Sequence, residues 1–177
     1  ALMPQTLLAL AAILMFSYFA LSQHSATADV ERFAITGEIE MAAARLARQR
    51  LATITARAFD EADVGESRVR TSPTGLSPLG PDDGLLTETS EADYDDVDDA
   101  HGAPARAVSA PWMDETIAFT DSVSVRYVAV GTSGITFSGT PTLMKEVTVT
   151  VRAAPQGFVG RPEIAATLSQ VVTPSSN

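Results

Sequence analysis

Hydrophobic residues occupy the beginning of the chain almost without interruption, and the pattern changes twice afterwards. Residues 1–22 read ALMPQTLLALAAILMFSYFALS, and no Asp, Glu, Lys or Arg occurs among the first 28 residues. An α-helix of about 22 residues is roughly 33 Å long, which matches the hydrocarbon core of a bilayer. The first segment therefore predicts a helix that lies in a membrane or in another apolar environment.

A helical spacing of apolar residues continues beyond this run to about Phe59, and Gly65 is the predicted stop. Residues 17–25 are weaker helix formers, which predicts a break in the helix somewhere between Leu14 and Ser25 once subunits are assembled. The apolar residues expected on one face of the second half are Ile39, Ala43, Leu46 and Ile54. The arginines expected on its other faces are Arg45, Arg48 and Arg50.

The last third of the chain alternates with period two, which is typical of half-buried β-strands. The clearest segment is KEVTVTVRA, in which Val147, Val149 and Val151 share one face. Strands are predicted near residues 117–119, 122–130, 135–137, 145–153 and 164–172. Three to five antiparallel strands present an apolar face, which the second half of the helix is expected to cover. The predicted fold class is α+β: a long N-terminal α-helix, hydrophobic in its first half, packed on a small antiparallel β-sheet.

The middle of the chain has another character. Residues 66–113 are rich in Pro and Gly, and Asp82 to Asp99 contains nine acids in 18 residues. This composition is typical of disorder or of an extended surface loop, and a loop of this length is usually functional or held by partners. The predicted organisation is a helix at 1–60 with a membrane or filament-core segment at 1–25, an acidic loop region at 61–113 and a sheet domain at 114–177.

Composition excludes several classes of function. The chain has no cysteine, so disulfides, thiolate metal sites and a thiol nucleophile are absent. The net charge of −10 arises entirely after Asp60, and such an acidic body repels phosphate backbones, so no nucleic-acid partner is predicted. His24 and His101 are the only histidines, and no nucleophile-elbow or phosphate-loop motif is present. No enzymatic activity is predicted.

An acidic box is the one constellation that could carry site chemistry. Its carboxylates are oxygen ligands of the kind that Ca²⁺ takes, although Val97 interrupts them and the spacing is not that of an EF-hand. Three interpretations stay open: a Ca²⁺ site, an acidic loop paired with arginines, or a solvated loop. The weak Ca²⁺ candidates are Asp93, Asp95, Asp96, Asp98 and Asp99; the candidate arginines are Arg68, Arg70, Arg106 and Arg126; no other cofactor is predicted. The loop is predicted to be ordered in an assembly, through the apolar anchors Leu85, Leu86, Tyr94, Val97 and Trp112.

The order of these elements resembles the type IV pilin family, in which a long, initially hydrophobic helix packs on a small antiparallel sheet. The segments LGPDDGLLTE (Leu79 to Glu88) and DYDDVDDAHG (Asp93 to Gly102) resemble MSHA-type (mannose-sensitive haemagglutinin) minor pilins. In those proteins a DDVDD-like box, followed by His or Tyr and Gly, precedes the strands. SVSVRYV and MKEVTVTVRA match the order of the later elements, so the detailed resemblance covers residues 79–153.

The N-terminus departs from this family. Type IV pilins usually begin with an N-methylated aromatic residue and carry a Glu at the fifth position, where this chain has Ala1 and Gln5. Gln offers only a neutral carbonyl to a neighbouring subunit's amine, and a buried amine without a partner is costly. Either the amine is handled differently or the usual docking rule does not apply. Ala1 is expected to be a processed end.

The resemblance implies a structural subunit that polymerises with copies of itself into an extracellular filament on the cell surface. Before assembly the subunit would wait in the inner membrane and meet the pilus assembly machinery. The residues expected to matter for assembly are Ala1, Pro4, Gln5, Leu10 and Ala12. Two alternatives stay open: a minor pilin or tip adhesin, and a single-pass membrane protein with a periplasmic domain in a secretion or pilus assembly machine.

Overall fold

The structure, a computed structural model, describes residues 4–81, 88, 90–112, 115–132, 134–153 and 163–175. A helix α1 (Pro4–Thr55) is followed by a single 3₁₀ turn, η1 (Glu61–Asp63). The strands are β1 (Arg106–Trp112), β2 (Glu115–Gly131), β3 (Gly134–Phe137), β4 (Lys145–Ala153) and β5 (Ala165–Val172). The chain divides into two compact units, Ala1–Ile39 and Glu40–Asn177, and α1 runs through the boundary between them.

The first unit is helical from Pro4 onward. Pro4 occupies the first turn, where its missing N–H would have no intrahelical acceptor. Every side chain from residue 4 to residue 27 is exposed, although most of them are apolar. Two hydroxyls in this stretch donate to carbonyls about one turn earlier: Ser25 Oγ to Ser22 O at 2.9 Å, and Thr27 Oγ1 to Gln23 O at 3.0 Å. These hydroxyls are therefore satisfied without water, as an apolar environment requires.

The helix is continuous from Pro4 to Thr55, including residues 17–25. The break predicted for this stretch concerns an assembled filament, so it stays a prediction.

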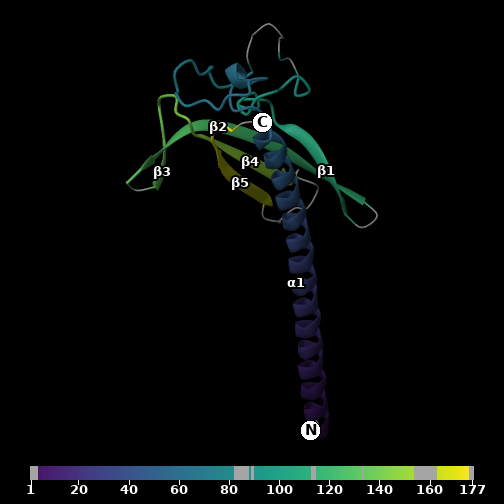
Figure 1. Cartoon of the computed structure of the whole chain (residues 1–177). Helices are drawn as coiled ribbons and strands as arrows, with labels where there is room; N and C mark the ends of the chain where they lie inside the picture. Colours follow the sequence, from purple (N-terminus) through teal and green to yellow (C-terminus); the bar gives the residue numbers. More distant parts are fainter. Residues whose placement is uncertain are drawn as a thin grey trace. The chain divides into compact units, whose positions relative to one another are not determined.

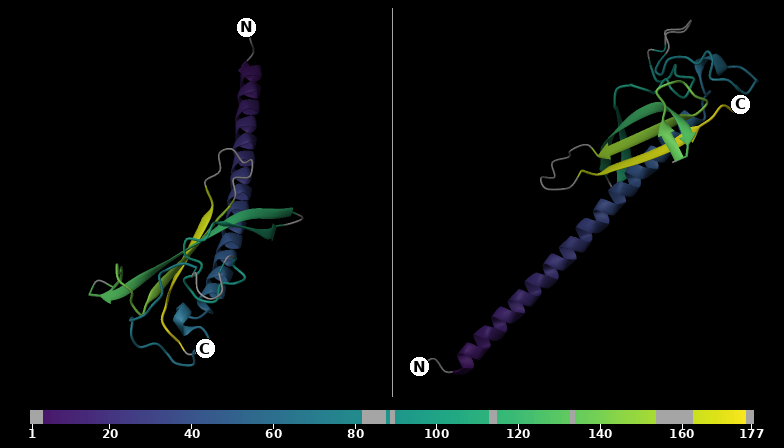
Figure 2. Two further views of the ribbon diagram at one scale, coloured as in Figure 1. Left: turned by 90° about the horizontal axis from the view of Figure 1, so that it is seen from above. Right: turned by 90° about the vertical axis from the view of Figure 1, so that its left-hand side faces the viewer.

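The second unit contains an antiparallel sheet in the order β1-β2-β4-β5, with β3 paired to the far end of β2 (Figure 1). The 17-residue β2 joins both parts: its first half pairs with β1, its last four residues pair with β3, and β4 lies along its other edge. The β2–β3 hairpin extends beyond β4 and β5 (Figure 2). The predicted antiparallel sheet is confirmed, and all five predicted strand regions lie in β2 to β5 except for Ile164, which directly precedes β5.

The core of this unit lies between the last turns of α1 and one face of the sheet. Ala43, Ala47, Leu51 and Ile54 recur at helical spacing and are buried. The sheet contributes Phe119, Val125, Val147, Val149 and Val151. Small alanines let a helix approach a sheet closely, and the period-two valines present a continuous apolar surface to it. The prediction of a long helix packed on an antiparallel sheet is therefore confirmed.

Three details differ from the expectations. The helix ends at Thr55, before the predicted limit at Phe59, because the residues after it extend to pair with the acidic segment. β1 lies inside the range assigned to the loop region. The expectation that Arg50 lies on another face than the apolar residues is wrong: Arg50 is buried, and its guanidinium forms ion pairs with Glu91 and Asp121, although its Nε makes no hydrogen bond to the described residues.

Candidate functional site

The acidic segment Ser90–Gly102 is folded by its own carboxylates. Asp96 Oδ1 accepts hydrogen bonds from the backbone N–H groups of Asp98 and Asp99, at 2.7 and 3.1 Å. Asp99 Oδ2 accepts from the N–H groups of Asp95 and Asp96, both at 2.8 Å. Hydrogen bonds to a carboxylate are stronger than neutral ones, so these four bonds hold a compact double turn.

This turn is attached to the segment that follows α1. Ala58 N–H donates to Asp95 O at 3.2 Å, and Val97 N–H donates to Ala58 O at 2.9 Å, which forms a short parallel bridge. Val97 is completely buried beside it. The bridge places Asp60, two residues after Ala58, next to the carboxylates of the acidic box.

A second attachment uses the sheet. The outer edge of β2 is paired by β1 up to Asp121 and by β3 from Val128, which leaves a gap between them. In this gap Val125 N–H donates to His101 Nδ1 at 3.1 Å. Gly102 follows with a positive φ of 72°, a conformation that favours glycine and turns the chain away from the sheet. The acidic segment is therefore attached to the edge of β2 within this gap.

Lys145, the first residue of β4, supplies the positive charge at the centre. It has the same parity as Val147, Val149 and Val151, so its side chain lies on the buried face and is fully inaccessible. Its Nζ donates to Phe59 O at 2.7 Å and to Asp60 Oδ2 at 3.4 Å, and it forms an ion pair with Asp98 Oδ1. The rings of Phe59 and Tyr127 lie 4.7 and 5.6 Å from Nζ, within the range of cation–π attraction.

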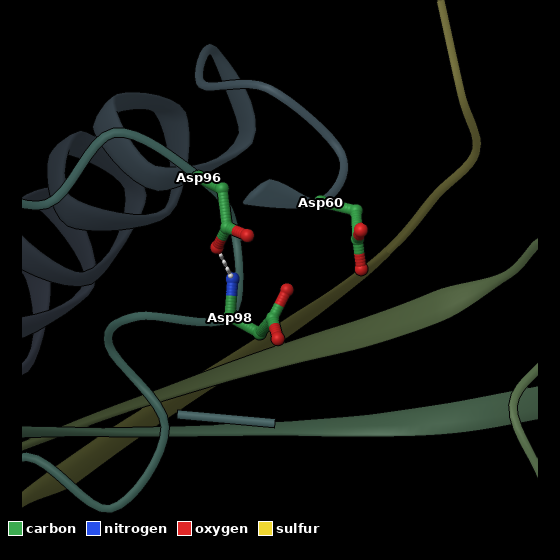
Figure 3. A group of neighbouring side chains, drawn as sticks. All are labelled: Asp60, Asp96 and Asp98. Atoms are coloured by element: carbon green, nitrogen blue, oxygen red, sulfur yellow. Dashed lines mark hydrogen bonds between the residues drawn. The ribbon is translucent and has the colours of Figure 1, made fainter. Parts of the chain in front are cut away.

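Ser77 and Arg70 also contact the Asp60 carboxylate. Its Oδ2 accepts from both N–H and Oγ of Ser77 at 3.0 Å, and Arg70 lies 3.7 Å from its Oδ1. Figure 3 shows that the carboxylates of Asp60, Asp96 and Asp98 converge although they come from two separate segments. One carboxylate oxygen from each lies within 4.8 Å of the other two. We call Asp60, Asp96, Asp98 and Lys145 the buried cluster.

Burial strongly perturbs these acids. Burial first, and then the neighbouring charges of Asp98 and Asp99, raise the pKa of Asp96 to about 9. Burial also raises the pKa of Asp98, against the opposing effect of the Lys145 ammonium. The pKa of the Tyr127 hydroxyl is raised by burial and by the adjacent carboxylates. At neutral pH the buried cluster thus holds a proton that an exposed aspartate would release.

A separate ion network lies between α1 and β1. Arg50 and Arg106 both pair with Glu91, and Arg106 Nη2 also donates to Asp121 Oδ2 at 2.8 Å. These residues line a cavity of about 420 Å³. The two guanidiniums face two carboxylates, so this cavity is balanced in charge and offers no excess attraction for an anion.

The five sequence candidates for Ca²⁺ binding separate into two groups. Asp96, Asp98 and Asp99 are buried, whereas Asp93 and Asp95 are exposed. Asp93 instead accepts hydrogen bonds from Ser90 N–H and Oγ. The solvated-loop interpretation is wrong for the described residues 90–102, because most of their carboxylates are buried or hydrogen-bonded.

The predicted arginine pairing is correct for Arg106 alone among the four candidates. Arg106 pairs with Glu91 of the acidic run, whereas Arg70 pairs with Asp60 and Asp63, and Arg126 with Glu146, all outside it. Arg68 forms no ion pair with the described acids of the run from Asp82 to Asp99. Of the predicted anchors, Val97 is buried, Tyr94 and Trp112 are half-buried, and Leu85 and Leu86 lie outside the described residues.

Sequence reasoning missed Asp60 and Lys145. For Lys145 a signal was available, because its parity in β4 places it on the valine face. For Asp60 no such signal existed, because its position depends on the bridge between Ala58 and Asp96.

The predicted assembly residues lie on the exposed part of α1, except Ala1, which is outside the described residues. Pro4, Gln5, Leu10 and Ala12 are all exposed, Leu10 at 59%. By length and composition, α1 is apolar and long enough to cross a membrane.

Comparisons of the chain with protein-family models, with characterised proteins and with solved structures give no match.

Proposed function

We propose that this chain is a structural subunit that polymerises into an extracellular, type IV pilus-like filament through its hydrophobic N-terminal helix. The observation that carries the proposal is the exposure of the entire apolar stretch from residue 4 to residue 27, beside a second unit with its own core. Such a surface needs an apolar partner, either lipid or other copies of the same helix.

Assembly exchanges one apolar environment for another. When the helix leaves the membrane and enters a bundle, its burial is conserved, and the net gain comes from packing and polar pairing. Ala9, Ala11 and Ala12 are small residues that permit close approach between helices. The acidic second unit then faces solvent, where its negative charge keeps it soluble.

Introducing a charge into the helix tests this mechanism. We expect Leu10→Arg or Ala12→Glu to abolish filaments, because a charge in such an environment costs about 2.5–3.5 kcal/mol on insertion scales. Ser124→Arg, at an exposed position of β2, is the matched control and should leave filaments intact. Trp112 fluorescence checks that the second unit stays folded in each variant. Normal filaments from the helix variants would refute the proposal.

The main alternative is a single-pass membrane protein that never polymerises, which the same exposed helix would also suit. Electron microscopy and mass spectrometry of sheared surface appendages distinguish the possibilities. A main filament subunit is the principal band, a minor pilin or tip adhesin is a trace, and a membrane component stays with the cell pellet.

A further inference from the structure

One oxygen of the buried cluster has no partner. Asp98 is 1% exposed, and its Oδ2 makes no hydrogen bond in the part of the chain that the structure describes. In Figure 3 the Asp98 carboxylate points into the space between Asp60 and Asp96. A buried carboxylate oxygen without a donor or a cation is unfavourable, so this position favours either the proton that the cluster holds at neutral pH or a bound cation in its place.

The charged groups around Asp98 also favour a ligand that carries positive charge. Four carboxylates are buried here, those of Asp60, Asp96, Asp98 and Asp99. The cations in contact with them are Lys145 and Arg70. Without a bound cation, the proton that the cluster holds at neutral pH offsets part of this negative charge. A divalent cation would replace that proton and neutralise the two excess negative charges that remain when all four acids are ionised.

The spacing of the oxygens suits such an ion. The three converging carboxylates place one oxygen each within 4.8 Å of one another. Ca²⁺ binds oxygens at about 2.3–2.6 Å, so two ligands on opposite sides of the ion are roughly 5 Å apart. The separation of the three oxygens is therefore compatible with one shared ion.

We propose that Asp60, Asp96 and Asp98 form a binding site for a divalent cation of the Ca²⁺ class, with Asp98 Oδ2 as its central ligand. Lys145 remains on Asp98 Oδ1, the opposite oxygen of the same carboxylate. Asp99 is not among the three carboxylates that converge, and its Oδ2 accepts hydrogen bonds from two backbone N–H groups. The bound ion would join the acidic segment to the segment after α1 and so stabilise the second unit.

The adjacent ammonium limits the affinity. Lys145 repels a second cation, and only three protein carboxylates are offered where Ca²⁺ takes six to eight oxygens. We therefore expect a Kd of about 10⁻⁴–10⁻³ M, the range of extracellular Ca²⁺ modules. This inference concerns the second unit and is independent of whether the chain polymerises.

The test uses the full chain in detergent micelles after treatment with a chelator. Ca²⁺ at millimolar concentration should raise the temperature at which Trp112 fluorescence reports unfolding. Tb³⁺ should bind the same site and emit when tyrosine is excited, because the Tyr127 ring lies beside the cluster. Ca²⁺ should then displace Tb³⁺.

Asp96→Asn is the informative variant, because its amide oxygen still accepts the two backbone N–H groups that fold the turn. It should weaken Ca²⁺ binding by about tenfold or more, since loss even of residues that only support metal ligands weakens sites by about 10–100-fold. Asp93→Asn, at an exposed acid in the same segment, should bind like the wild type. Equal responses of wild type and Asp96→Asn, or a shift reproduced by NaCl at equal ionic strength, would overturn the proposal.

Discussion

Replacing Lys145 by Met should strongly destabilise the second unit. Met keeps much of the side-chain length but removes the ammonium that contacts Phe59 O, Asp60 and Asp98. Both carboxylates are buried, so Asp98 loses its cation and Asp60 keeps only Arg70, and neither gains water. Removing one partner of a buried ion pair costs about 3–5 kcal/mol. This loss is a large fraction of the roughly 5–15 kcal/mol that stabilises a typical domain.

The assay is urea unfolding of the full chain in detergent, followed by the fluorescence of Trp112 and carried out with chelator. The matched control is Arg126→Met on the exposed face of β2, where the guanidinium pairs with Glu146 at 2.6 Å. Because Arg126 is 53% exposed, its loss should cost only about 0–1 kcal/mol. If the two substitutions lowered the free energy of unfolding equally, the burial of Lys145 would not increase its contribution to stability.

The double variant Lys145→Met/Asp98→Asn distinguishes two causes of the destabilisation. One is the loss of the ion-pair attraction, and the other is the cost of leaving the Asp98 carboxylate buried without a cation. If most of the effect comes from the uncompensated Asp98 carboxylate, neutralising that residue should recover part of the stability lost in Lys145→Met. Additive losses would contradict this explanation.

Three further predictions concern the same unit. With chelator present, wild-type stability should fall from about pH 4 to about pH 9, because the raised pKa of Asp96 lets the folded state hold one proton more than the unfolded state. The slope should approach about 1.4 kcal/mol per pH unit and should flatten in Asp96→Asn; parallel pH profiles of the urea midpoint would contradict it. Gly102→Ala should cost about 1–2 kcal/mol, measured in the same assay, because φ is 72° there. A protease that cuts after acidic residues should cleave residues 90–102 slowly in the wild type and rapidly in Lys145→Met, and fast cleavage of both would mean that the segment opens freely.

The regular elements could be predicted because their signals are local. In β4 the alternation of Val147, Val149 and Val151 is sufficient to identify both the strand and its buried face. In α1 the spacing of Ala43 and Ile54 identifies the face that covers the sheet. β1 gives a weaker signal: its burial does not alternate, and it contains Pro111, which sheets accept only at an edge. β1 is indeed an edge strand.

The state of the acidic segment could not be predicted, because its partners are distant in the sequence. Composition alone favours disorder when many like charges lie together. The cation that compensates Asp98 is Lys145, which lies 47 residues later in the chain and in a different strand. Arg50, which pairs with Glu91, lies 41 residues earlier. Only the folded topology brings these charges together, so the residue pattern left pairing, metal binding and solvation open.

The two units differ in where their exposed apolar side chains and buried charged side chains find partners. The apolar side chains of residues 4–27 are not covered by the described residues of the chain, so their stabilisation is expected to come from lipid or from other molecules. The charged side chains of the buried cluster find their partners inside the second unit, from Asp60 to Lys145. Under the proposed function this separation is useful, because the helix would change neighbours while the second unit stays folded. The proposed cation, and an acidic segment attached to its own sheet, would keep the fold of the second unit independent of the neighbours that the helix acquires.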